Sequence, residues 1–313
     1  AEASTTASSL SLSGSRLEVQ NLVATGNSSL SGSNNTWRNV ELSGTGAWMT
    51  FSGTDNKWMG GSLHGGHAQY GSGFDEPIDL FGATNAVIDG VEFYGITRTP
   101  DPDVDKNPHL EIIRIDRGSM NTTIKNSYFH DNDENTGTIF MTALAGYPVS
   151  SGLTLLNNRF ADNPTGSTNL AVNDLMPCNT ILIAYNTFLG GTNGVACSSS
   201  SNVRWIGNLG AHAMFNCVGS FSYNVWEDQA GTPCGATDTL VVGTRYKHEL
   251  LGLGGPDGFH LLAGSPAINK AETPSATSIS APTGGAGPTS VTADAYGGSR
   301  PYPTGGRCDA GAH

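Results

Sequence analysis

The feature that most constrains the fold is a short stretch of sequence that the chain repeats. In "MNTTIKNSYFHDNDENTG" the apolar anchor Ile124 is followed by Asn126 two positions later and by Phe129 three positions after that. The stretches around Ile88 and Leu155 keep this spacing. The aligned copies begin at anchors that are 16 to 36 residues apart: Val19, Trp37, Trp58, Ile88, Ile124, Leu155, Ile183, Trp205 and Phe221. The chain is therefore built from short, similar units.

Each unit alternates like a strand and can bury its apolar face only against a neighbouring unit, which is how solenoids are built. Most anchors are followed two or three positions later by Asn or Gly, which suit a turn with a left-handed backbone conformation: Asn21, Asn39, Gly60, Gly90, Asn126, Asn157, Asn186, Gly207 and Asn224. We predict one coil of a parallel β-helix per unit, with Asn126 and Asn157 in a turn ladder. A column of phenylalanines should stack inside: Phe93, Phe129, Phe160 and Phe188.

The C-terminal region supports this interpretation. "FHLLAGSPAIN" is followed further on by "DAYGGSRPYPTGGRCDAGAH". These stretches resemble the closing segment of the right-handed parallel β-helix proteins that bacteria secrete, in which Ser-Pro-Ala-Ile precedes Asp-x-x-Gly-x-x-Arg-Pro and Asp-x-Gly-Ala. The resemblance implies an all-β chain with a single right-handed parallel β-helix of about nine coils.

The expected organisation has three parts. Residues 1–15 form an N-terminal cap or first coil, and residues 16–250 form the β-helix. Residues 251–313 form a capping segment with a Pro/Gly/Ser/Thr-rich loop. We expect this segment to cover the strand edges at the open end of the solenoid, because exposed edges invite aggregation.

The charge and hydropathy of the chain disfavour two classes of binding partner, nucleic acids and membranes. The formal net charge is −12, whereas proteins that bind nucleic acids or anionic membranes usually present a basic surface. No apolar run has the length of a membrane span. The opening "AEASTTASS" resembles the mature end that removal of a signal peptide leaves. We therefore expect a secreted monomer with no nucleic-acid partner and no membrane insertion.

The five cysteines include no Cys-x-x-Cys pair, which disfavours a zinc site. Cys178 and Cys197 lie about one coil apart, as do Cys217 and Cys234, so that stacking can bring each pair within bonding distance. We predict these two disulfides, with Cys308 left free. Buried free thiols are the alternative.

The longest intervals between anchors lie in the middle of the chain, at 63–88, 93–124 and 129–155. Solenoids gather such extra residues into loops on one face, which is often the binding face. The polysaccharide lyases and hydrolases among β-helix proteins bind their polymer in a groove of this kind. We therefore expect a polysaccharide partner over the middle coils.

The strand "HLEIIRIDRG" carries the candidate catalytic residues. A bulge between Ile112 and Ile113 would keep Arg114 out of the core and point Glu111 and Asp116 outward with it. His109 would then be the base in an elimination reaction, and Arg114 would hold the substrate carboxylate. Glu111 or Asp116 would orient His109, or would act as the acid if the reaction is hydrolysis.

Neighbouring coils supply candidate substrate-binding residues, which are Asp79, Arg117, Lys125, His130, Asn173 and Asp174. Five of the 15 basic residues lie within 28 positions: Arg98, Lys106, Arg114, Arg117 and Lys125. This clustering slightly favours elimination on an acidic polymer. The alternative is structural: His109 would end a loop, Arg114 and Asp116 would form a surface ion pair, and His130 would belong to a turn.

A calcium site is the one cofactor that the sequence suggests. In "DPDVDK" the acidic residues Asp101, Asp103 and Asp105 alternate. The stretch lacks the glycine and the terminal glutamate of a helix-loop-helix calcium loop. A solvated loop is the alternative.

The sequence contains no clear signature of polygalacturonases, pectate lyases or chondroitinases. Cleavage of glycosidic bonds in an extracellular polysaccharide is our main hypothesis, with β-elimination favoured over hydrolysis. The alternative is a non-catalytic carbohydrate-binding or adhesive surface solenoid, for which exposed tyrosines would provide platforms: Tyr70, Tyr94, Tyr128 and Tyr147. A purely structural solenoid is opposed by the irregular middle coils.

Overall fold

The computed structural model describes residues 5–68, 76–99, 109–133, 136–161, 168–172, 180–189, 192–195, 203–210, 217–228, 233–242, 253–254, 259–271 and 309–311. Every regular element within these ranges is a β-strand. The chain is therefore all-β over its described part, as predicted. Eight residues with predicted roles lie outside these ranges: Asp101, Asp103, Asp105, Asn173, Asp174, Cys178, Cys197 and Cys308.

The strands form two main sheets. The long sheet contains β1 (Thr5–Ala7), β3 (Glu18–Gln20), β4 (Leu22–Ala24), β6 (Thr36–Ser43), β8 (Lys57–His64), β11 (Val87–Asp89), β12 (Glu92–Tyr94), β15 (Met120–Lys125), β16 (Tyr128–His130), β18 (Ser151–Leu156), β19 (Arg159–Phe160), β21 (Ile181–Ala184), β22 (Thr187–Phe188), β24 (Val203–Ile206), β25 (Leu209–Gly210), β26 (Ser220–Ser222), β27 (Val225–Asp228) and β28 (Thr239–Val242). The short sheet contains β2 (Ser11–Leu12), β5 (Ser28–Leu30), β7 (Met49–Phe51), β10 (Ile78–Phe81), β14 (Glu111–Asp116), β17 (Gly137–Met141), β20 (Thr168–Val172) and β23 (Thr192–Val195). Two small pairs complete the set, β9 (His67–Ala68) with β13 (Thr97–Arg98) and β29 (Leu253–Gly254) with β30 (His260–Leu261).

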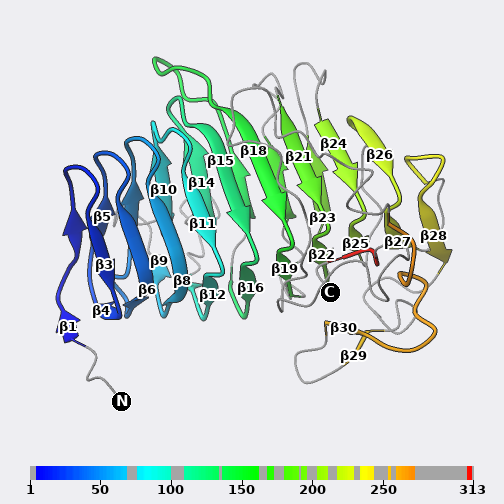
Figure 1. Cartoon of the computed structure of the whole chain (residues 1–313), viewed down its shortest axis with the longest axis horizontal. Helices are drawn as coiled ribbons and strands as arrows, with labels where there is room; N and C mark the ends of the chain where they lie inside the picture. The colour runs from blue at the N-terminus through cyan, green and yellow to red at the C-terminus, as the bar shows by residue number, and fades with distance from the viewer. Residues whose placement is uncertain are drawn as a thin grey trace.

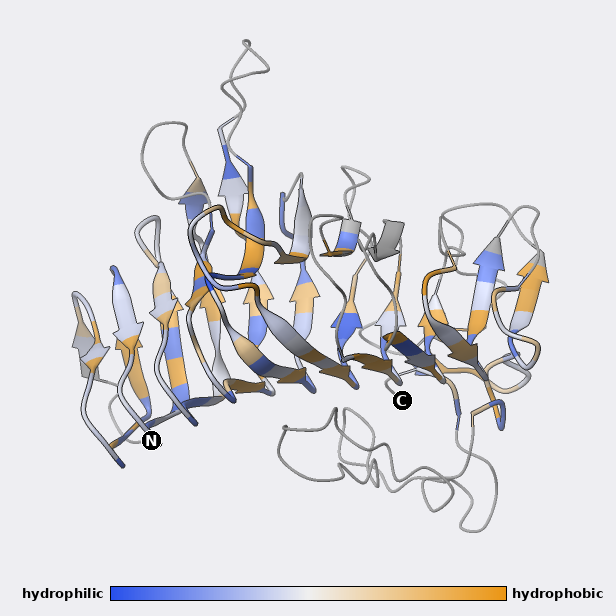
Figure 2. Ribbon diagram, turned by 90° about the horizontal axis from the view of Figure 1, so that it is seen from above, coloured by the Kyte–Doolittle hydropathy of each residue, from blue (hydrophilic) through white to orange (hydrophobic). Residues whose placement is uncertain are grey.

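The chain alternates between the two sheets and pairs each strand in parallel with the equivalent strand of the next unit. Figure 1 shows the strands side by side along the long axis, and Figure 2 shows the rows from above. The predicted anchors form one column in the long sheet, where Val19 pairs with Trp37 and every later anchor pairs with its successor as far as Phe221. This is the arrangement of stacked coils in a parallel β-helix.

The predicted turn ladder is present at Asn126 and Asn157. Both residues have a positive φ, 53° and 55°. The amide of Asn157 donates to Oδ1 of Asn126 at 3.4 Å, and the amide of Asn126 donates to Oδ1 of Asp89 at 2.7 Å. The side chains of successive coils are therefore linked along this turn.

The turn assignment was wrong at Asn186 and Asn224. Tyr185 and Tyr223 occupy the positive-φ positions of those coils, with φ of 55° and 58°. The asparagines lie one residue further on and belong to a second, buried ladder. The spacing rule of two or three residues after the anchor cannot distinguish these adjacent positions.

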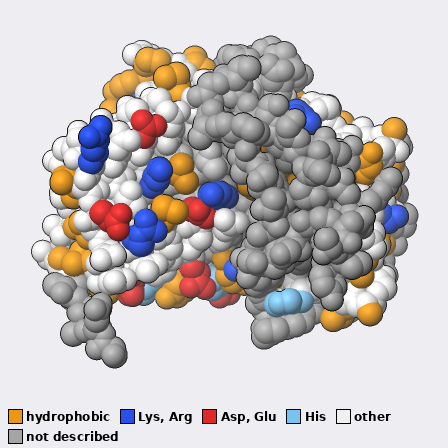
Figure 3. All heavy atoms as spheres, viewed as in Figure 1, with side chains coloured by type: hydrophobic (Ala, Val, Ile, Leu, Met, Phe, Trp, Pro, Cys, Tyr) orange, Lys and Arg blue, Asp and Glu red, His pale blue; other side chains and the backbone are white. Residues whose placement is uncertain are grey.

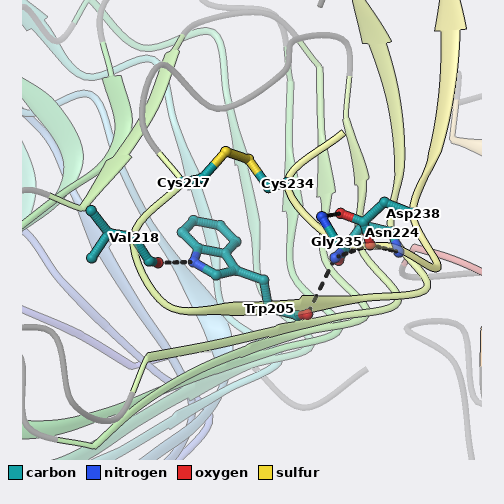
Figure 4. The surroundings of a disulfide bond; sticks show 7 residues. All are labelled: Trp205, Cys217, Val218, Asn224, Cys234, Gly235 and Asp238. Atoms are coloured by element: carbon teal, nitrogen blue, oxygen red, sulfur yellow. Dashed lines mark hydrogen bonds between the residues drawn. A yellow bond between two sulfur atoms is a disulfide. The ribbon is translucent and has the colours of Figure 1, made fainter. Parts of the chain in front are cut away.

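The buried ladder consists of Asn158, Asn186, Asn208, Asn224 and Asp238. In each, Oδ1 accepts a hydrogen bond of 2.9–3.0 Å from a backbone N–H of the coil before it. The four asparagines have no exposed surface. Figure 4 shows the last step, in which Asp238 also accepts from Gly235. Burial raises the pKa of Asp238, and the hydrogen bonds that it accepts oppose this rise.

The predicted phenylalanine column is confirmed. The rings of Phe93, Phe129, Phe160 and Phe188 stack at centroid distances of 4.7, 4.9 and 4.8 Å. All four side chains are buried. The stack shows that coils of different length keep the same register in the core.

Of the two predicted disulfides, Cys217–Cys234 is confirmed, with a Cα–Cα distance of 5.4 Å (Figure 4). It joins the segment before β26 to the segment before β28. A disulfide is consistent with an extracellular protein, because such bonds persist in oxidising compartments.

The described parts of the predicted capping segment cover the flank of the long sheet. Phe259 contacts Tyr128 edge to face, at 5.3 Å between centroids. Ala271 packs in a cluster with Tyr185 and other outward-facing residues of the later coils. The N–H of Gly311 donates to the carbonyl of Gly207. That residues 251–313 also close the end of the solenoid stays a prediction.

We predict that Asn186→Ala lowers the free energy of unfolding by about 3–5 kcal/mol, because it leaves several buried groups of the asparagine ladder unpaired. Asn126→Gly is the matched control, since it removes an amide of the outer turn ladder but tolerates the positive φ. It should lower the free energy of unfolding by less than about 1 kcal/mol. Urea unfolding of both variants measures the difference, and equal losses would contradict the importance of the buried ladder.

Candidate functional site

Strands β10 and β14 bring predicted site residues together on the outward face of the short sheet. Asp79 pairs with Arg114, and Phe81 pairs with Asp116. The alternating residues Ile78 and Leu80 are buried, so Asp79 and Phe81 point away from the core. The alternation thus places one acidic, one basic and one aromatic side chain on this face.

Five charged residues form an ion network on this face: Glu76, Asp79, Arg114, Asp116 and Arg117. Arg114 contacts Glu76 and reaches Asp116 with Nε at 2.9 Å from Oδ2. Arg117 lies 3.6 Å from Asp79 and 3.7 Å from Asp116. Both guanidinium groups are therefore already engaged by carboxylates.

The carboxylates of this network stabilise the charged form of Arg114. Burial lowers its pKa, but Glu76, Asp116 and Glu111 outweigh burial, so the pKa lies above its ordinary value. The predicted role of Arg114, to hold a substrate carboxylate, stays a prediction. A substrate carboxylate would have to compete with Glu76 and Asp116 for this guanidinium.

Asp79 has a raised pKa in this network. Burial raises its pKa to about 6, the charge of Asp116 adds to this rise, and Arg117 opposes it. Its Oδ1 has no hydrogen-bond partner among the described residues. Burial also raises the pKa of Asp116, against the opposing effects of Arg114 and Arg117. The pKa of Asp79 therefore lies in the mildly acidic range.

A cleft of about 190 Å³ opens beside Asp79, between strands β5, β7 and β10. Thr50 of β7 pairs with Asp79 of β10, and Trp48 precedes β7. The cleft is lined by Asn27, Ser28, Trp48, Met49, Thr50, Glu76 and Asp79. Polar residues from three successive coils therefore line one small volume.

An aromatic platform lies next to the ion network. Phe81 and Tyr147 are 38% and 49% exposed, and their rings meet edge to face at 6.3 Å. The guanidinium carbon of Arg117 lies 4.5 Å from the centroid of Phe81 and 5.4 Å from that of Tyr147. Of the tyrosines proposed as platforms, Tyr147 is the one in this position, and Tyr70 lies outside the described residues.

The other residues of the predicted catalytic strand do not line an open groove together, as the sequence analysis expected. His109 is exposed and precedes β14. Glu111 and Asp116 are buried, with 3% and 0% of their surface exposed, instead of lining an open groove. The pairing of β14 with β17 shows no register shift at the predicted bulge, although Ile112 and Ile113 are both buried, as the bulge prediction required. The catalytic roles of these residues stay predictions.

Lys125 and His130 belong to the long sheet and do not join the ion network. Lys125 pairs with Asp89 at 3.1 Å. His130 contacts Glu92 and Asp131, and its ring stacks on Tyr94 and Tyr128. Figure 3 shows basic and acidic side chains interspersed over the early coils. The clustered basic residues of the sequence do not make one basic patch in the described structure.

The described residues hold no group of three or more His, Cys, Asp or Glu side chains placed to bind a metal ion. They also include no helix long and apolar enough to cross a membrane. The predicted calcium ligands lie outside the described residues, so calcium binding stays a prediction.

Sequence reasoning missed Glu76, Trp48, Thr50 and Phe81. The signal for Phe81 is available, since it is the next outward position after Asp79 in "PIDLFG". Thr50 could have been found by aligning "MTF" with "IDL", the stretches that pair between β7 and β10. The position of Glu76 depends on how the chain enters β10, which strand periodicity does not specify.

We predict that Asp79→Asn stabilises the protein more at pH 7 than at pH 4. The pKa of Asp79 is raised in the folded state, so its contribution to stability is present below about pH 4 and is lost as the pH rises through about 6. Asparagine does not titrate. The gain in unfolding free energy of the variant over wild type should grow by about 1–2 kcal/mol across this range.

Urea unfolding at both pH values measures this change. Thr50→Val is the control, because Thr50 lines the same cleft but carries no titrating group. It should change with pH as the wild type does. The same pH dependence in Asp79→Asn as in wild type would refute the raised pKa.

Comparisons with known proteins give a distant structural similarity. No family model matches the chain, and no curated protein matches it. Among solved structures, the chain is similar to PfbA, a surface adhesin of Streptococcus pneumoniae, with 14% sequence identity and a TM-score of 0.38. The match covers 74% of this chain and 71% of that one. At this distance the similarity carries no conclusion about function.

Proposed function

We propose that this chain is a secreted, right-handed parallel β-helix that binds an extracellular polysaccharide on the outward face of the short sheet, around β7, β10 and β14. The observation that carries the proposal is the aromatic platform of Phe81 and Tyr147 beside the polar cleft. Exposed aromatic rings can pack against the apolar faces of sugar rings. Neighbouring carboxylates and hydroxyls can then bond the sugar hydroxyls.

The platform is preorganised for this task. Arg117 lies against both rings and is itself held by Asp79 and Asp116, which restricts the movement of the platform. A surface that is already ordered loses less conformational entropy when a ligand binds.

The charges favour a neutral polymer over an acidic one. The ion network contains three carboxylates and two guanidinium groups, so it leaves no cation in excess. A polymer of uronic acids would meet net negative charge at this face. β-Elimination also requires neutralisation of a substrate carboxylate, and here both arginines are engaged by protein carboxylates. We therefore favour carbohydrate binding over the lyase hypothesis.

We predict that Phe81→Ala and Tyr147→Ala each weaken binding of a neutral polysaccharide about tenfold, which corresponds to the loss of one aromatic contact. Affinity electrophoresis against dextran, mannan, mixed-linkage glucan, alginate and polygalacturonate identifies the ligand class. Titration calorimetry then gives the Kd of each variant.

Leu262→Ala is the matched control, because Leu262 is 49% exposed but lies in the C-terminal region. It should bind as the wild type does. Tighter binding to the acidic polymers than to the neutral ones, or unchanged binding after both aromatic substitutions, would overturn the proposed function.

A further inference from the structure

Exposed apolar side chains gather at one corner of the solenoid, where three successive coils pass from the short sheet to the long sheet. Six large apolar side chains are exposed among the described residues, and four of them lie at this corner: Phe81, Met120, Tyr147 and Val149. They are 38%, 44%, 49% and 46% exposed. Figure 3 shows apolar atoms gathered at the upper left, near the starts of β15 and β18 in Figure 1. We call these four residues the apolar corner, and such exposed patches mark interaction sites.

The turns beneath the apolar corner are tied together. The N–H of Ala83 donates to Oγ of Ser119 at 3.1 Å, and the N–H of Ser119 donates to Oγ of Ser150 at 3.0 Å. Both serines have no exposed surface. On the outside, Gly118 approaches Pro148 so closely that a Cβ on Gly118 would lie 2.9 Å from the Cβ of Pro148. The three turns therefore hold the exposed side chains in fixed positions.

The apolar corner continues the aromatic platform. Phe81 and Tyr147, which form the platform, supply half of the corner. Val149 follows Tyr147 by two residues, and Met120 pairs with Ser151, two residues after Val149. A polymer that lies on the two rings therefore has aliphatic side chains beside it.

These aliphatic side chains distinguish hydroxyl groups from methyl groups. Valine offers no hydrogen bond, and the methionine thioether is only a weak acceptor. A sugar hydroxyl pressed against them loses water without a replacement partner, which is unfavourable. A methyl group buried at the same place strengthens binding about fourfold. The corner therefore favours sugars that carry methyl groups over sugars that carry only hydroxyls.

We infer that the polysaccharide bound at this face carries methyl groups, either in O-acetyl substituents or at C6 of 6-deoxy sugars, and that Met120 and Val149 select them. This inference rests on the proposed function and names the class of polymer. An anionic lipid surface also suits exposed apolar side chains. It is disfavoured here, because Asp79 and Asp116 lie against Arg117, which itself contacts both rings of the platform.

The test compares two pairs of neutral polymers by titration calorimetry with the full chain. The first pair is O-acetylated galactoglucomannan and the same preparation after mild alkaline deacetylation. The second pair is D-rhamnan, a polymer of 6-deoxymannose, and mannan. In at least one pair, the Kd of the methyl-bearing polymer should be at least about fourfold lower than that of its partner.

Two substitutions locate the recognition of the methyl group. Val149→Thr replaces a methyl group by a hydroxyl at nearly constant shape, and Met120→Gln replaces the thioether by an amide of similar length. Each should reduce the preference to less than about twofold. Leu262→Gln is the matched control, because it removes an equally exposed apolar side chain from the C-terminal region. It should keep the wild-type preference.

The outcomes separate this inference from the proposed function. A preference in the first pair identifies the acetyl group, and one in the second pair identifies the 6-deoxy methyl group. Binding without a preference in either pair overturns the inference and leaves the proposed function standing. A preference that survives both substitutions also overturns it, since the methyl groups are then recognised elsewhere. Failure to bind any polymer overturns the proposed function itself.

A second copy of the chain is the competing occupant of the apolar corner. Sedimentation velocity at rising protein concentration tests for it. A monomer at all concentrations supports the inference. A dimer that Val149→Thr weakens would show that the corner is covered by protein, and would overturn the inference.

Discussion

The parallel hydrogen-bonded register between coils is the constraint on which the rest of the structure depends. A residue in one coil lies directly beside its equivalent in the next, so any property that repeats in sequence becomes a continuous row in space. The phenylalanine stack is one such row, and the buried ladder from Asn158 to Asp238 is another. The ladder satisfies backbone donors that turn away from the sheet at each corner, where an unpaired buried N–H would be costly. Coils of different length therefore keep their register at the anchors of the long sheet.

The same register creates the candidate site. Thr50, Asp79 and Arg114 come from three successive coils and are separated widely in sequence, yet each pairs directly with the next. Insertions between coils alter the loops but not this row. The outward face of the short sheet can thus carry residues that the core does not restrict, and in this chain it carries a network of opposite charges, a polar cleft and an aromatic platform.

Much of the fold could be predicted from sequence, because the anchors from Val19 to Phe221 repeat one pattern of a buried apolar residue followed by a turn. The structure pairs each anchor with the next, as this pattern predicts. The site could be predicted only in part. Strand alternation placed Asp79 outward, but it could not show that Asp116 lies buried beneath its ion pairs. Nor could alternation show that His130 lies apart from the ion network. The chain leaves the short sheet after β14 and enters the long sheet before it reaches His130 in β16. Burial of a charged side chain depends on neighbouring coils, which local periodicity does not specify.

The ion network is not an efficient way to stabilise the fold. Desolvation of charged groups offsets much of their mutual attraction, so apolar residues of similar size can often replace a shielded ion network without loss of stability. This network also leaves Asp79 with a raised pKa, which means that ionisation of Asp79 is less favourable in the folded protein than in the unfolded chain. The neighbouring coils of the same face show that uncharged residues fit there, since Ser29 and Thr50 occupy the equivalent positions before Asp79. A charged group that costs stability where serine and threonine would fit agrees with the proposed role of this face in binding a ligand.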